Sequence, residues 1–121
     1  MDINKIIASG TSGLEPDREA RAAEVAAWNR DGQDEQAKSD NVVLTERHIE
    51  VINCLQENYI ERGECRHARD LATMLTQRFS AQGGRKYLYE LFPGGPVFQG
   101  GRLAGIPVPS DAQDASFGSV L

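Results

Sequence analysis

Two cysteines and two histidines are the side chains of this 121-residue chain most capable of chemistry. Cys54 and Cys65 are too few for a disulfide scaffold, and with His48 and His67 they form neither a CxxC nor an HxxxH pair, so no metal site is predicted. Cys65 precedes Arg66 and His67 at a predicted helix start, where cationic neighbours make a thiol more reactive. Cys65 is therefore a candidate nucleophile, with an inert, partly exposed thiol as the alternative. Cys54 is expected to act as a small buried hydrophobe.

Charged residues are unevenly distributed along the chain, whose formal net charge is −5. Residues 1–44 contain nine acids and five bases, a net charge of −4. Residues 62–102 contain three acids and seven bases, which are Arg62, Arg66, Arg69, Arg78, Arg85, Lys86 and Arg102, a net charge of +4. The overall acidity argues against indiscriminate nucleic-acid binding. The basic segment either forms a surface for an anionic partner or belongs to ordinary solvated helix faces.

Composition indicates one small globular domain with loose ends, since 40% of residues are apolar and 26% are charged. Such a chain has little room for a deep catalytic cleft. No apolar run reaches the length of a membrane span and no signal-peptide pattern is present, so we expect a cytoplasmic protein. The sequence contains no GxSxG, phosphate loop or recognisable acid pair, so enzyme chemistry has little support and no cofactor is predicted.

Apolar spacing predicts a pair of helices in the middle of the chain. The first begins after Thr45, a good N-cap, and ends near Gly63. Its apolar stripe consists of Ile49, Ile52, Leu55 and Tyr59. The second runs from about residue 66 to 79. Because only a few residues separate them, we expect a helix–turn–helix pair.

The segments before this pair are less regular. Residues 1–15 favour a weak strand and a turn, or no fixed structure. Residues 16–28 predict a helix, with Trp28 docking it onto the core. Residues 29–41 have no apolar face and indicate a linker or a loosely held helix.

The segments after the pair alternate between short helices and turns. Residues 85–92 predict a mostly buried short helix, and the Pro-Gly-Gly-Pro sequence at 93–96 predicts a turn. A further short helix is expected at 96–103 and an extended stretch at 104–109, where prolines alternate. Residues 110–121 are small and polar, which is typical of a flexible tail.

Several short motifs carry a family resemblance. The helix start Leu-Thr-Glu-Arg-His at 44–48 matches "LTEEHW", and Val-Ile-Asn at 51–53 matches "IIN". The most specific stretch is YLYELFPGGP at 87–96, against "YLYxLFPxGP". Trp28, Tyr59, Arg69, Gln99, Arg102, Ala104, Gly105, Pro107 and Pro109 follow the same order of positions. Over about two-thirds of its length the chain resembles the DsrC/TusE/DsvC family, the sulfite reductase gamma-subunit-like sulfur-relay proteins.

The resemblance implies a mainly α fold, with a small α+β fold as the alternative. Its expected architecture is an orthogonal helical bundle with a helix–turn–helix-like core, a short N-terminal hairpin that the first 25 residues do not match, and an extended, mobile C-terminal arm. The corresponding division is a variable N-terminal segment at 1–28, a polar linker at 29–43, the helical domain at 44–109 and the tail at 110–121.

The resemblance also implies the family's function, sulfur carriage, and implies that this chain lacks the cysteines that perform it. Family carriers hold sulfur on a cysteine near the end of the arm, some with a second cysteine upstream, and these positions correspond to Ala112 and Gly101. Neither residue can hold a persulfide, so we expect a non-catalytic partner-binding or regulatory protein of sulfur metabolism. Its expected partners are proteins of sulfur-transfer or sulfite-reductase complexes. The residues expected to bind them are Arg69, Tyr87, Tyr89, Gln99 and Arg102.

Two alternative functions stay open at this point. One is a DNA-binding regulator that presents the start of its second helix to DNA and touches phosphates nearby. The residues expected to do so are Arg66, His67, Arg69, Arg85 and Lys86. The other is sulfur transfer through Cys65.

Overall fold

The computed structural model describes residues 16–112, and over that range the chain is mainly α-helical and contains no strand. The helices are α1 (Pro16–Asp31), α2 (Gln33–Ser39), α3 (Glu46–Arg62), α4 (Ala68–Arg78), α5 (Arg85–Leu91) and α6 (Phe98–Ala104), with a 3-10 turn η2 (Ser80–Gln82). The mainly α prediction is confirmed. The predicted N-terminal strand and hairpin, at residues 1–15, lie outside the described residues.

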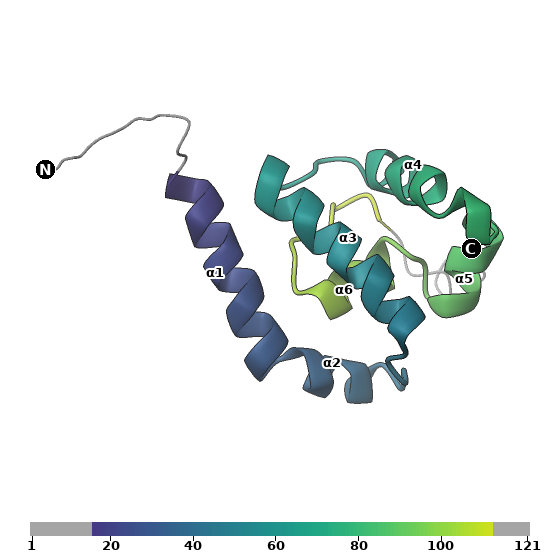
Figure 1. Cartoon of the computed structure of the whole chain (residues 1–121), viewed down its shortest axis with the longest axis horizontal. Coiled ribbons are helices and arrows are strands. Elements are labelled where there is room, and N and C mark those ends of the chain that lie inside the picture. Colours follow the sequence, from purple (N-terminus) through teal and green to yellow (C-terminus); the bar gives the residue numbers. More distant parts are fainter. Residues whose placement is uncertain (1–15, 113–121) are drawn as a thin grey trace, which may run out of the picture.

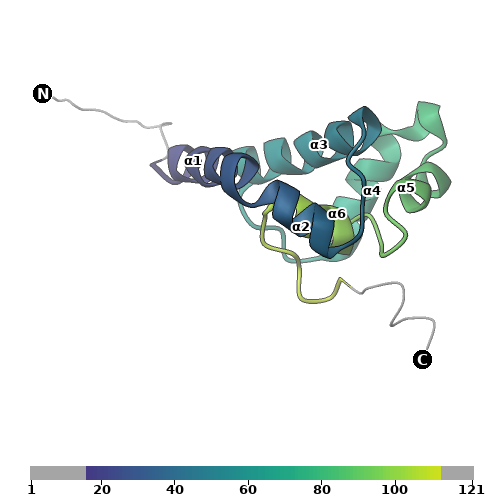
Figure 2. The same cartoon turned by 90° about the horizontal axis from the view of Figure 1, so that it is seen from below.

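Helix α3 is the centre of the molecule. Helix α6 packs against it, and α1 lies on one side of it and α4 and α5 on the other (Figures 1 and 2). Its side chains supply much of the core. The fully buried large residues are Val51, Ile52, Leu55, Leu75, Leu88, Phe92 and Leu103.

The ends of α3 follow the sequence prediction. The Thr45 hydroxyl accepts from the His48 amide, and the Thr45 amide donates to His48 Nδ1 at 3.3 Å, which completes a capping box. The other ring nitrogen, His48 Nε2, lies 2.9 Å from the carbonyl oxygen of Leu91, which links the start of α3 to the end of α5. Gly63 ends the helix with a φ of 80°, a conformation that favours glycine.

The polar stretch at 29–41 is helical over most of its length, because it contains the end of α1 and the whole of α2. Of the two expectations for this stretch, a linker or a loosely held helix, the structure has helix at most of its residues. Ala37 is its anchor, since this side chain is buried in the core while its neighbours are polar.

Trp28 docks α1 onto the core, as predicted. Its indole Nε1 donates to the Leu103 carbonyl at 2.7 Å, so the end of α1 is fixed to the end of α6. A second link is buried: the amide groups of Asn29 and Gln56 bond to each other, and Gln56 Nε2 also donates to the Ala104 carbonyl at 2.9 Å. These bonds give hydrogen-bond partners to a glutamine side chain that is only 4% exposed.

Among the later helices, α5 begins at residue 85 as predicted, whereas α4 and α6 begin slightly later than predicted. Helix α4 begins at Ala68 instead of residue 66, and α6 begins at Phe98 instead of residue 96. Gly105, in the left-handed region with a φ of 72°, ends α6, and the next residues run without helix, as the alternating prolines predict. No helix of the described part of the chain is long and apolar enough to cross a membrane.

Candidate partner-binding site

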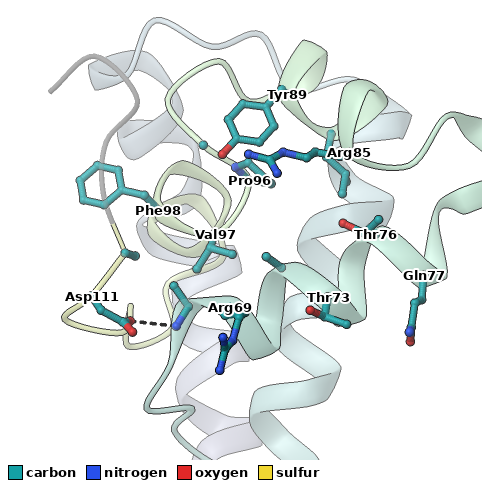
Figure 3. A pocket seen from close by; sticks show the side chains of 15 residues that line it. Arg69, Thr73, Thr76, Gln77, Arg85, Tyr89, Pro96, Val97, Phe98 and Asp111 are labelled. Atoms are coloured by element: carbon teal, nitrogen blue, oxygen red, sulfur yellow. Dashed lines mark hydrogen bonds between the residues drawn. The ribbon is translucent and has the colours of Figure 1, made fainter. Parts of the chain in front are cut away.

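A pocket of about 630 Å³ lies between α4, α5, the turn before α6 and the C-terminal arm (Figure 3). Its lining residues are Ala68, Arg69, Ala72, Thr73, Thr76, Gln77, Arg85, Leu88, Tyr89, Gly95, Pro96, Val97, Phe98, Asp111 and Ala112. We call this the α4–α5 pocket.

Helix periodicity sets which side chains reach the α4–α5 pocket. On α4, Leu71 and Leu75 are buried in the core, so Thr73 and Thr76, on a neighbouring face, line the pocket. On α5, Leu88 is buried beneath the pocket, while Arg85 stays exposed. The pocket therefore has an apolar floor and a polar wall.

Aromatic and cationic groups meet at one end of the pocket. The Arg85 guanidinium lies over the Tyr89 ring, 5.4 Å from its centroid. Tyr89 is 39% exposed, one of two large hydrophobic residues that the described part of the chain leaves exposed. Arg69 lies at the other end of the pocket, on the first turn of α4 (Figure 3).

The C-terminal arm contacts the pocket through Asp111. Its Oδ1 accepts from the Ala68 amide at 2.8 Å, and its Oδ2 lies 3.5 Å from His67 Nδ1. The N-cap residue of α4, His67, makes no side-chain cap, so the arm supplies the acceptor that the helix start lacks. The Ala68 hydrogen bond, helped by His67, lowers the pKa of the Asp111 carboxyl below its usual value.

The end of the described arm reaches the same place. Ala112 lines the pocket and packs against the core. The predicted flexible tail falls outside the described residues except at 110–112, and there Asp111 and Ala112 lie against α4.

Of the five residues predicted to bind a partner, two line the α4–α5 pocket and three make contacts within the fold. Arg69 and Tyr89 line the α4–α5 pocket. Tyr87 is buried and stacks on Phe79, with ring centroids 6.2 Å apart.

The other two predicted partner residues make contacts within the chain. Gln99 accepts from the Gly94 amide at 3.0 Å and so fastens the turn before α6. Arg102 pairs with Asp40 at 3.1 Å, which ties α6 to the end of α2.

The residues predicted to contact DNA are all exposed, and they lie around the start of α4 and the start of α5. They are Arg66, His67, Arg69, Arg85 and Lys86. The structure brings them to neighbouring elements, but it also places the Asp111 carboxylate at the first amide of α4.

The two cysteines differ in their surroundings, and both are free thiols. Cys54 is 4% exposed, as predicted for a small buried hydrophobe, and burial raises the pKa of its thiol. Its sulfur donates to Met74 Sδ at 3.5 Å. Cys65 is half-buried and donates to the His67 carbonyl at 3.3 Å. Within residues 16–112, no three His, Cys, Asp or Glu side chains gather as metal ligands would.

Gly101, predicted to replace a cysteine, is buried in α6. A Cβ atom at this position would lie 2.8 Å from Val108 Cγ2, so the arm's valine fills the space that a side chain would need.

Asp111 and the two threonines of α4 were not predicted from the sequence as site residues. Asp111 lies 43 residues from the amide it binds, so no local spacing connects the two. An aspartate is a common helix N-cap, but its position in the chain gives no sign of which helix it caps. Thr73 and Thr76 can be identified as pocket residues only once the packing of α4 on α5 is known.

Known proteins resemble this chain over most of its length. The family described as DsrC like protein matches residues 10–112. The sulfurtransferase TusE of Photorhabdus laumondii is 39% identical over 74 residues, 60% of this chain and 67% of that protein. The TusE homolog of Haemophilus influenzae is 32% identical over 98 residues, 80% of this chain and 90% of that protein.

A solved structure agrees with these matches. The NMR structure of DsrC from Allochromatium vinosum is 41% identical and covers 66% of this chain and 72% of its own, with a TM-score of 0.56. The family match, the relatives and the fold lead to one conclusion: the chain belongs to the DsrC-like family of sulfur-relay proteins.

Proposed function

We propose that this chain is a partner-binding or regulatory member of its sulfur-relay family and does not carry sulfur on its arm. The observation that supports this most directly is the cysteine content, since both cysteines precede residue 66. By resemblance, the carrier positions are Gly101 and Ala112. A glycine and an alanine offer no nucleophile for persulfide formation.

The arm nevertheless keeps a defined place on the fold. Asp111 holds it to the start of α4, and Val108 packs against Gly101. A chain that keeps the docking of its arm without the sulfur atom suits recognition of relay proteins more than transfer. It would occupy or sense a docking site in a sulfur-transfer or sulfite-reductase complex.

Pull-down with the full chain tests this proposal. The baits are sulfur-transfer proteins and a sulfite-reductase complex, with a cysteine-bearing family member as positive control. We expect this chain to bind at least one bait and to compete with the carrier for it. If the carrier binds and this chain binds none of the baits, the proposal is wrong.

A DNA-binding regulator is the second candidate, because five basic or titratable residues near the starts of α4 and α5 are exposed. Asp111 and the exposed Asp70 oppose it, since both add negative charge where the helix would approach phosphates. A gel-shift titration across salt separates the two functions. DNA binding requires a log–log salt dependence with a slope of roughly −0.9 for each phosphate neutralised.

A further inference from the structure

We propose that the α4–α5 pocket binds a short segment of a partner protein in which an aliphatic or aromatic side chain lies next to a carboxylate. This inference rests on the proposed partner-binding function and names the chemistry by which the partner is recognised.

The floor of the pocket accounts for the apolar part of the segment. Leu88 and Val97 lie below it, and Ala72 and Pro96 border it. At about 630 Å³, the pocket lies within the size range of roughly 300–1,000 Å³ that ligand sites occupy. An apolar side chain placed here would leave water for a largely apolar surface, which is favourable.

The two arginines account for the carboxylate. Arg69 and Arg85 lie at opposite ends of the pocket, on α4 and α5 (Figure 3). Within the described residues, neither arginine pairs with a carboxylate, and the Arg85 guanidinium lies over the Tyr89 ring. A guanidinium held against an aromatic ring is oriented in advance for paired hydrogen bonds to a carboxylate.

Asp111, the one acidic residue that lines the pocket, forms no ion pair with these arginines. Asp111 directs one oxygen to the Ala68 amide and the other to His67. The rim of the pocket therefore has two guanidinium groups that form no ion pair within the described residues. Its one carboxylate, that of Asp111, is already hydrogen-bonded to the start of α4. Thr73 and Thr76 add hydroxyls between them that can bond to a peptide backbone.

The apolar floor favours a peptide over a nucleic acid. A phosphate backbone would pair with the arginines but would make no apolar contact with Leu88, Val97 and Tyr89. The net charge of −5 also opposes a long polyanion, whereas one or two carboxylates meet only the local charge of the rim.

Titration of the isotope-labelled full chain with pooled blocked tetrapeptides tests the inference by NMR. One pool has two acidic and two apolar residues, a second has Asn and Gln in place of the acids, and a third has Ser in place of the apolar residues. We expect saturable shifts of pocket amides, including Thr73, Leu88 and Tyr89, with the first pool. Binding of either control pool should be about tenfold weaker or more, since each lacks one of the two interactions.

Substitutions in the full chain locate the site. Arg69→Ala and Arg85→Ala should each weaken binding of the acidic apolar pool by about tenfold. Lys86→Ala is the matched control, because Lys86 is an exposed base beside Arg85 that does not line the pocket, and it should leave binding unchanged. Circular dichroism confirms that each variant is folded.

Three results would overturn the inference: no shifts with the acidic apolar pool, equal binding of the uncharged pool, or shifts outside the pocket. The same variants in the pull-down separate this inference from the proposed function. If the partners are captured equally by Arg69→Ala and Arg85→Ala, the proposed function stands and the inference fails. If the peptides bind at the pocket but no relay partner is captured, the inference stands and the proposed partner class is wrong.

Discussion

At the scale of single residues, Gly101 shows how closely the C-terminal arm packs against α6. The space beside this glycine is filled by Val108, whose Cγ2 would lie 2.8 Å from an added Cβ. A side chain at 101 would therefore force the Val108 side chain to shift from its observed place.

Gly101→Ala should lower the free energy of unfolding by about 1–3 kcal/mol, the usual cost of overpacking a core. Val108→Ala in the same chain should recover most of this loss, because it removes the clashing methyl group. Denaturant unfolding of the single and double variants measures the coupling. Gly94→Ala is the matched control, since its Cβ would meet Gln99 at an ordinary 3.4 Å. A Gly101→Ala variant as stable as the parent chain would refute the clash.

The two thiols should react in a fixed order. Cys65 is half-buried, whereas Cys54 is buried and its raised thiol pKa leaves little thiolate at neutral pH. With iodoacetamide at pH 7 we expect one adduct, on Cys65, and a second only after unfolding. Peptide mass mapping locates each adduct.

Incubation with a persulfide donor then tests the alternative of sulfur transfer. An unmodified Cys65 removes that alternative, and a stable persulfide on Cys65 supports it. Cys65→Ser is the control, because it leaves only the buried Cys54 to react.

At the scale of elements, helix α4 depends on the arm for its first amide. Asp111 accepts from Ala68, and this bond is the main cause of its lowered pKa. A carboxyl with a lowered pKa contributes its stabilisation above the ordinary aspartate pKa and loses it as the pH falls through the lowered value. The arm should therefore stay bound to α4 at neutral pH and be released only in acid.

An NMR pH titration of the Ala68 amide shift follows this release. We expect its midpoint below 3.8, the ordinary value for aspartate. In the Asp111→Asn variant the carboxyl is replaced by an amide, so the acid transition of Ala68 should vanish. Asp111→Ala should make the first turn of α4 exchange its amide protons faster. A midpoint at or above 3.8 would contradict the assigned bond.

Elements whose determinants are close in sequence could be predicted, and elements held by distant contacts could not. Helix α3 has its cap at Thr45, its apolar stripe and Gly63 within one short stretch, so its bounds follow from local chemistry. Helix α2 has no apolar stripe and relies on the single buried Ala37. The α4–α5 pocket was not predicted because it depends on the packing of two helices, a property that periodicity does not encode.

At the scale of the whole molecule, charge is separated across α3. Helices α1 and α2, each with a net charge of −1, lie on one side, and α4 and α5, each with a net charge of +1, lie on the other (Figure 1). The exposed acids of α1 and α2 are Asp17, Glu19, Glu24, Asp31, Asp34 and Glu35. A partner with one acidic surface would therefore meet the α4–α5 side first, because opposite charges steer encounter.

The stability of the fold should also differ between α1 and the core helices, since α1 is attached mainly by polar contacts. Val25 is the one buried side chain among residues 17–31. Arg21 donates to the Ile60 carbonyl at 2.7 and 3.1 Å, and Arg18 pairs with Glu61 at the surface. Exposed ion pairs stabilise little, so α1 should detach at lower cost than the core helices open.

Hydrogen exchange tests this order. We expect the amides of α1 to exchange faster than those of α3 and α6, whose side chains form the core. Trp28→Phe keeps an aromatic ring but removes the five-membered part of the indole together with the Nε1–H that bonds to Leu103. The lost hydrogen bond alone costs about 1 kcal/mol, so α1 should exchange at least about fivefold faster still. Because the Leu103 carbonyl also accepts from Gln33 at 3.4 Å, this acceptor is not left without a partner. Exchange in the middle of α3 should not change, and equal protection of α1 and α3 in the parent chain would show that the molecule opens as one unit.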